Sequence, residues 1–158
     1  MTAGTVIIGM GNPLLSDDGV GIAVAHAVAE RLKQTVNLTV TELHTGGIRL
    51  MEAMAGFKRA VVVDAMLSGA VPGTVRNFDP QDFVTTKNTF SSHDTDFETA
   101  YDLGKMTGVP LPEQFSFWGI EAAEFDLFGE CFTDRVAAAV PLAVERIVAQ
   151  ITKWEGAA

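Results

Sequence analysis

Residues 5–21 read TVIIGMGNPLLSDDGVG, and this segment indicates how the first half of the chain folds. Residues 5–10 form a short apolar, β-branched run, which is typical of a strand buried on both faces rather than of an edge strand. Apolar residues then recur at helical spacing over residues 19–33, which predicts an amphipathic helix. A buried strand followed by a helix is typical of the first unit of an α/β domain.

The rest of the sequence continues this alternation of strands and helices. The predicted elements are strands at 38–43, 59–63, 74–78 and 114–120 and helices at 49–54, 94–106 and from Thr133 to about residue 151, the last kinked at Pro141. Parallel strands need crossover connections, so the order predicts a doubly wound α/β sheet. The connection between the strands at 59–63 and 74–78 is short enough for antiparallel pairing.

Length and composition restrict the function classes. The chain has 158 residues, 47% hydrophobic and 20% charged, and fits one globular domain over residues 1–158. The net charge of −9 argues against nucleic acid or an anionic membrane as a partner. The sequence lacks the run of about 18 apolar residues that a membrane span needs. A single cysteine and a start without a signal-peptide pattern lead us to expect a cytoplasmic protein.

Acidic residues follow two of the predicted strands. Asp18 lies in the turn after the first strand, and Asp64 ends the apolar run 60–63. If the strand order begins 2-1-3, both carboxylates lie at the crevice beyond the carboxyl ends of the strands, where they must repel, take up a proton or share a cation. The alternative is structural: Ser16 and Asp17 would cap the first helix, and Asp64 would be a turn residue.

Histidine could complete such a cation site. His93 precedes the predicted helix at 94–106, where it is a surface residue or a ligand. Two carboxylates and one neutral imidazole suit a borderline divalent ion such as nickel and leave coordination positions open. His44 is a weaker spare ligand, His26 is expected to be packed or exposed rather than catalytic, and Cys131 is expected to be a buried thiol rather than a nucleophile.

Other catalytic and binding motifs find little support. A dinucleotide fingerprint needs a third glycine where this chain has Leu14, and Asp17 and Asp18 would repel a pyrophosphate at the helix start. The sequence contains neither a Gly-x-Ser-x-Gly elbow nor a His-Glu-x-x-His motif, so a serine hydrolase or a zincin is not supported.

Four segments resemble one known family, the endopeptidases that mature nickel-iron hydrogenases by removing a C-terminal extension from the large subunit. The segments are residues 9–21, residues 61–65 followed by Pro72-Gly73-Thr74, residues 91–93 (Ser-Ser-His), and residues 128–130 (Phe-Gly-Glu). The first is the most specific because it combines the glycines, an asparagine, two leucines and an acidic pair. The similarity extends over nearly the whole chain.

The resemblance implies a single-domain three-layer sandwich, with a twisted, mostly parallel sheet of about five strands and helices on both faces. It implies a metal-sensing site of Asp18, Asp64 and His93, with Asp18 or Asp64 as the candidate catalytic base. The nickel would belong to the hydrogenase large-subunit precursor and would not be permanently bound by the protease, which we expect to be a monomer. Asn12, Asp17 and the pair Gly46 and Gly47 are expected to support the site or contact the substrate.

Two points qualify this interpretation. Many relatives continue after Ser-Ser-His with a helix start that contains Gly or Leu, whereas this chain places Asp94, Asp96 and Glu98 there, which suits a helix N-terminus or a specialised precursor. No conventional nucleophile is visible. An alternative is therefore a nickel-binding protein or hydrogenase-assembly chaperone of the same fold that does not cleave its partner.

Overall fold

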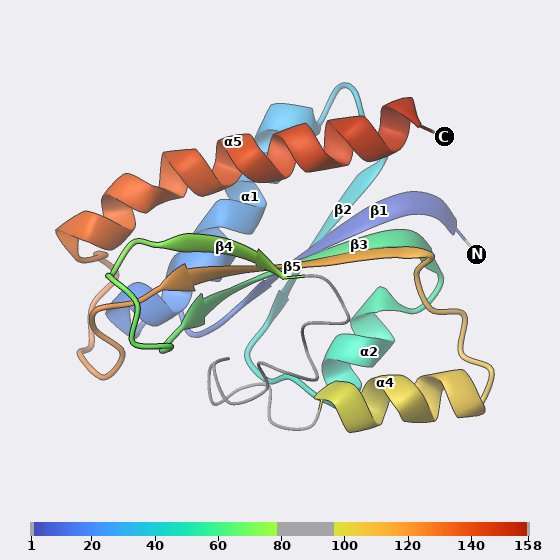
Figure 1. The fold of residues 1–158 in the computed structure, drawn as a ribbon, viewed down its shortest axis with the longest axis horizontal. Helices are drawn as coiled ribbons and strands as arrows, with labels where there is room; N and C mark the ends of the chain where they lie inside the picture. Colours follow the sequence, from blue (N-terminus) through green and yellow to red (C-terminus); the bar gives the residue numbers. More distant parts are fainter. Residues whose placement is uncertain (1, 79–96, 158) are drawn as a thin grey trace.

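The computed structural model describes residues 2–78 and 97–157, which form one five-stranded sheet with the strand order β2-β1-β3-β5-β4 (Figure 1). The elements are β1 (Thr2–Met10), the 3-10 helix η1 (Ser16–Gly19), α1 (Val20–Leu32), β2 (Leu38–Leu43), α2 (Ile48–Met54), β3 (Phe57–Met66), β4 (Val75–Phe78), α4 (Phe97–Met106), β5 (Gln114–Glu121) and α5 (Asp134–Gly156). The order 2-1-3, on which the predicted proximity of Asp18 and Asp64 depends, is found.

Four of the strands are parallel, and β4 alone runs antiparallel to its neighbour. The antiparallel direction expected for residues 74–78 is found, but the partner of β4 is β5 and not β3. Strand β5 is buried along nearly its whole length, whereas the two central residues of β4 are exposed. A strand buried on both faces belongs inside a sheet, so β5 inserts beside β3 and leaves the short β4 at the edge.

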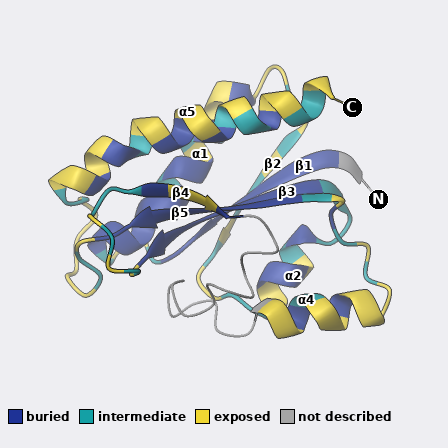
Figure 2. Ribbon diagram, in the orientation of Figure 1, coloured by how far each residue is buried: buried dark blue, intermediate teal, exposed yellow. Residues whose placement is uncertain are grey.

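Helices cover both faces of the sheet, as predicted. In Figure 1, α1 and α5 lie on one face and α2 and α4 on the other, and Figure 2 shows that the strands β1, β3 and β5 are largely buried. The core is accordingly divided in two by the alternation of side chains along the strands. Val61 and Val63 pack with α1 and α5, whereas Val62 and Met66 pack with α2 and the start of β5.

Two glycines of the 9–21 segment bring α1 unusually close to the sheet. A Cβ on Gly21 would lie 2.3 Å from the carbonyl oxygen of Val63, and a Cβ on Gly9 would lie 2.6 Å from the Cα of Ile22. Both contacts are with backbone, which cannot move aside easily. These glycines therefore serve helix-to-sheet packing, which accounts for them without a bound dinucleotide.

The end of the last helix, α5, is anchored near the amino end of the central strand β3. Arg59 is only 3% exposed and donates hydrogen bonds to Glu155, to the carbonyl oxygen of Trp154 and to Gln114. Helix α5 runs continuously through Pro141 and ends at Gly156, beyond the predicted end at residue 151. No helix within residues 2–78 and 97–157 is long and apolar enough to cross a membrane.

Candidate active site

The candidate site lies at the carboxyl edge of the central strands, where Asp18 and Asp64 are both buried. Asp18 belongs to η1, which follows β1 and contacts β3. Asp64 lies on β3, one residue beyond the pair formed by Gly9 and Val63. Strand alternation places its side chain with Val62 on the face covered by α2. The two carboxylates are therefore brought to adjacent parts of one edge, as the strand order predicts.

The turn after β1 holds Asp18 in place. The amide of Asn12 donates a hydrogen bond to Asp18 Oδ2 (2.8 Å), and the side-chain oxygen of Asn12 accepts one from the amide of Leu14 (3.0 Å). Gly11 has φ +129°, and a Cβ there would lie 1.8 Å from the carbonyl oxygen of Asp18. The turn thus requires glycine at this position, and Asn12 supports Asp18 through its backbone. On β3, the amide of Ala65 donates to Asp64 Oδ1 (2.8 Å).

Asp17 does not cap the first helix, so the structural alternative considered for this residue is wrong. Helix α1 has Gly19 at its N-cap, without a side-chain hydrogen bond. The buried carboxylate of Asp17 instead accepts hydrogen bonds from the amides of Ala123, Glu124 and Thr133 and from the Thr133 hydroxyl, at 2.8–3.0 Å. It therefore fastens both ends of the loop between β5 and α5 beside Asp18. Ser16 likewise donates its hydroxyl hydrogen to the carbonyl oxygen of Cys131 (2.9 Å).

The turn after β2 reaches the same edge of the sheet. His44 Nδ1 donates a hydrogen bond to the carbonyl oxygen of Gly11 (2.7 Å), since a carbonyl can only accept. Gly46 and Gly47 follow, and Gly47 takes φ +61° just before α2. These glycines shape the chain path from β2 to α2.

The complete three-residue ligand set cannot be assembled from the described part of the chain. His93, Asp94 and Asp96 lie outside the described residues, and Glu98 is exposed on α4. Within residues 2–78 and 97–157, no group of three His, Cys, Asp or Glu side chains could hold a metal ion. The set of Asp18, Asp64 and His93 therefore stays a prediction.

Two other expectations from the sequence have clear outcomes. Cys131 is exposed, so the prediction of a buried thiol is wrong. It lies in the surface loop before α5, and the path of this loop, rather than the apolar character of the side chain, determines its exposure. His26 is exposed on α1 and pairs with Glu42 of β2, in agreement with a role outside catalysis.

Sequence reasoning missed a fourth buried carboxylate at the same edge. Glu121, the last residue of β5, accepts hydrogen bonds from the amides of Ser68 and Gly69 and from the Ser68 hydroxyl. It holds the connection that follows β3. An acid directly after the apolar strand 115–120 was the available signal, by the same logic that selected Asp64.

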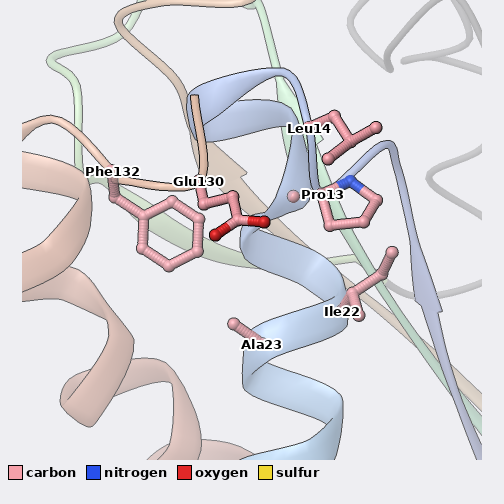
Figure 3. A pocket seen from close by; sticks show the side chains of 7 residues that line it. Pro13, Leu14, Ile22, Ala23, Glu130 and Phe132 are labelled. Atoms are coloured by element: carbon pink, nitrogen blue, oxygen red, sulfur yellow. The ribbon is translucent and has the colours of Figure 1, made fainter. Parts of the chain in front are cut away.

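A pocket of about 270 Å³ opens next to the η1 turn (Figure 3). It is lined by Pro13, Leu14, Gly19, Ile22, Ala23, Glu130 and Phe132. Its walls come from the turn after β1, from the first residues of α1 and from the end of the β5–α5 loop. Figure 3 shows the carboxylate of Glu130 between Phe132 and Pro13, so one acid borders an otherwise apolar space.

Comparison with known proteins decides the family. The family model described as hydrogenase maturation protease matches residues 22–150. The chain belongs to the hydrogenase maturation protease family. It is accordingly a peptidase, and the non-proteolytic chaperone alternative is not supported. The matched residues include Asp64 but begin just after the glycine-rich segment that carries Asp18.

Individual relatives agree with this assignment. The chain is 27% identical over 154 residues to the hydrogenase expression/formation protein HoxM of Cupriavidus necator, covering 96% of this chain and 75% of that protein. It is 25% identical to HupD of Rhizobium leguminosarum, covering 94% of this chain and 74% of that protein.

Solved structures share the fold. The hydrogenase maturating endopeptidase HybD from E. coli superposes with a TM-score of 0.77 at 22% identity, covering 94% of this chain and 92% of that one. The [NiFe] hydrogenase maturation protease HybD from Thermococcus kodakarensis gives a TM-score of 0.69 at 30% identity, covering 93% of this chain and 97% of that one. The predicted α/β fold with a mostly parallel five-stranded sheet is therefore confirmed.

Proposed function

We propose that this protease removes the C-terminal extension of a nickel-iron hydrogenase large-subunit precursor after nickel insertion, and that it senses the substrate-held nickel through Asp18, Asp64 and His93. The observation that carries the proposal is the pair of buried carboxylates, Asp18 and Asp64, at adjacent parts of one sheet edge. The names of the relatives, which refer to hydrogenase maturation and formation, support the substrate class.

The donor set explains why the protease would respond to a metal held by another protein. Buried carboxylates that lie near each other favour a shared proton or cation. Two carboxylate groups and one imidazole suit a borderline ion such as nickel, but they leave positions open. Such an incomplete set would bind a free ion weakly and would complete the coordination of nickel already held by precursor thiolates. Nickel is then part of the substrate, and no resident cofactor is needed.

The same residues can serve cleavage. Nickel on the precursor would polarise the scissile carbonyl or the attacking water, and Asp18 or Asp64 would accept the proton. Asp18 is fixed by the amide of Asn12, and Asp64 lies on a central strand, so neither carboxylate has to be ordered when substrate arrives. Cleavage would therefore report that nickel has been inserted.

Isosteric substitutions test these assignments. Asp18→Asn, Asp64→Asn and His93→Gln are each expected to lower the processing rate of nickel-loaded precursor by about 10²–10⁴-fold, the typical contribution of a positioned acid or base. The products are measured by intact mass, and thermal unfolding establishes that each variant is folded. Asp102→Asn and His26→Gln change exposed side chains and serve as matched controls. Near-normal rates for all three site variants would refute the assignment.

A further inference from the structure

The loop between β5 and α5 exposes apolar side chains beside the η1 turn. Leu127 is 63% exposed and Phe128 is 86% exposed. The next residue, Gly129, donates its amide hydrogen to the carbonyl oxygen of Leu14 (2.9 Å), which brings the loop against a third exposed residue, since Leu14 is 53% exposed. We refer to Leu14, Leu127 and Phe128 as the apolar patch. Large apolar side chains exposed on neighbouring segments mark interaction surfaces more often than scattered ones do.

The apolar patch continues into the pocket of Figure 3, because Leu14 belongs to both. The pocket has apolar walls from Pro13, Ile22 and Phe132 and a single carboxylate, that of Glu130. Lysine and arginine bury their aliphatic stems along apolar surface and keep the cationic head in a polar place. The pocket therefore has the chemistry to take such a side chain, with its head at Glu130.

The charge of the surrounding sequence favours the same occupant. The chain has no Lys or Arg before Arg31 and none between Lys105 and Arg135, so the segments that build the pocket carry no cation of their own. The loop adds Glu124 and Asp126 to Glu130. A basic segment would be attracted to this surface and an acidic one repelled.

Hydrogen bonds to the η1 turn restrain the loop in the absence of a partner. The four hydrogen bonds to Asp17 fix its ends, and the amide of Ser16 donates to the carbonyl oxygen of Gly129 (2.8 Å) near its middle. A fixed loop loses little conformational entropy on binding. Asp17 also ties this surface to its neighbour Asp18.

We propose that the apolar patch and the pocket at Glu130 form a docking site for the hydrogenase precursor, at which a Lys or Arg beside an apolar residue is bound. This inference rests on the proposed function. The docking site lies on the other face of the sheet from Asp64: α1, which forms one wall of the pocket, packs on one face, and Asp64 faces the other. At Gly19 the pocket adjoins Asp18. The precursor would thus contact the protease on both sides of the η1 turn.

Binding and processing kinetics test the docking site directly. Purified nickel-loaded precursor is used to measure Kd by interferometry and kcat and KM by intact mass. Glu130→Gln is expected to raise Kd and KM by about 2–5-fold, the value of a partly exposed ion pair, and Glu130→Arg by about tenfold. Phe128→Ser should raise both constants, while kcat stays within twofold of wild type for all three variants. The KM of the wild-type protease should increase with salt more steeply than that of Glu130→Arg.

Matched substitutions on distant surfaces provide the controls. Glu145→Arg makes the same charge reversal on an exposed position of α5, and Met106→Ser removes a comparably exposed apolar residue from α4. Unchanged Kd and KM for Glu130→Arg and Phe128→Ser would overturn the docking site, and a fall in kcat alone would also do so. If wild-type protease binds the precursor with the predicted dependence on Glu130 but does not shorten it, the proposed cleavage fails while the docking site stands.

Discussion

Replacing Asp17 should destabilise the fold strongly and release the β5–α5 loop. Its buried carboxylate accepts three amide hydrogens and one hydroxyl hydrogen from residues more than a hundred positions away in sequence. A hydrogen bond to a charged group contributes about 1.5–3 kcal/mol, and such bonds in one cluster are not additive. Asp17→Ala leaves the donors near the protein surface, where water recovers part of the loss. We therefore expect a loss of about 3–5 kcal/mol in the free energy of unfolding.

Asp17→Asn should cost less, because one oxygen remains. In the wild type, one oxygen of Asp17 accepts the amide of Thr133, and the other accepts the amides of Ala123 and Glu124 and the Thr133 hydroxyl. In the variant, only one of these two sets of donors keeps an oxygen to bind. The Thr133 hydroxyl can rotate and accept from the new NH₂ group. The expected loss is about 2–3 kcal/mol, which leaves a folded protein for measurement if its total stability lies in the usual range of about 5–15 kcal/mol.

Urea unfolding combined with amide hydrogen exchange measures both effects. The free energy of unfolding should fall in the order wild type, Asp17→Asn, Asp17→Ala. The amides of Ala123, Glu124 and Thr133 should lose protection in the folded variants. Asp126→Ala on the same loop removes an exposed carboxylate and is the control. A loss below about 1 kcal/mol for Asp17→Ala would refute the anchoring role, since it lies under the value of a single charged hydrogen bond.

Two further predictions concern packing and pH. Gly21→Ala should lower the free energy of unfolding, measured in urea, by about 3 kcal/mol, because the new Cβ would lie 2.3 Å from the Val63 carbonyl oxygen. The control Gly56→Ala, at φ +86° in open space, should lower it by about 1 kcal/mol. Equal losses would contradict close packing as the reason for Gly21. Burial and the nearby charge of Asp102 raise the pKa of Tyr101 above its usual value of 10.0, and it is the single tyrosine, so the tyrosinate absorbance reports it alone. Its stabilising contribution should be complete below pH 10 and be lost as the pH rises through the folded-state pKa, and Tyr101→Phe should remove this loss.

The sequence predicts those parts of the fold that depend on local patterns. The apolar strand 5–10, the helix after it and the strand at 59–63 define a β-α-β order, which predicts a doubly wound, mostly parallel sheet. In the structure α1 and α2 lie on opposite faces, and right-handed crossovers then place β1 between β2 and β3. That placement is what brings Asp18 and Asp64 to one sheet edge. The sequence did not predict that β5 lies between β3 and β4. This position depends on β5 being more deeply buried than β4, which follows from the tertiary packing.

Long-range contacts explain the other differences. Asp17 looks like a helix cap in sequence because its partners, Ala123, Glu124 and Thr133, are distant in the chain. A side chain that reaches distant backbone amides leaves no local pattern. The exposed position of Cys131 likewise follows from the path of the β5–α5 loop. The role of His93 stays a prediction because it lies outside the described residues.

The most direct test of the proposed function is the intact mass of a purified large-subunit precursor after incubation with this protease, with and without nickel in the precursor. Nickel-dependent processing predicts loss of one discrete C-terminal peptide from the nickel-loaded precursor and an unchanged mass for the nickel-free one. Equal cleavage of both forms would contradict nickel sensing. An unchanged mass of both forms, with binding demonstrated, would contradict the proposed processing reaction.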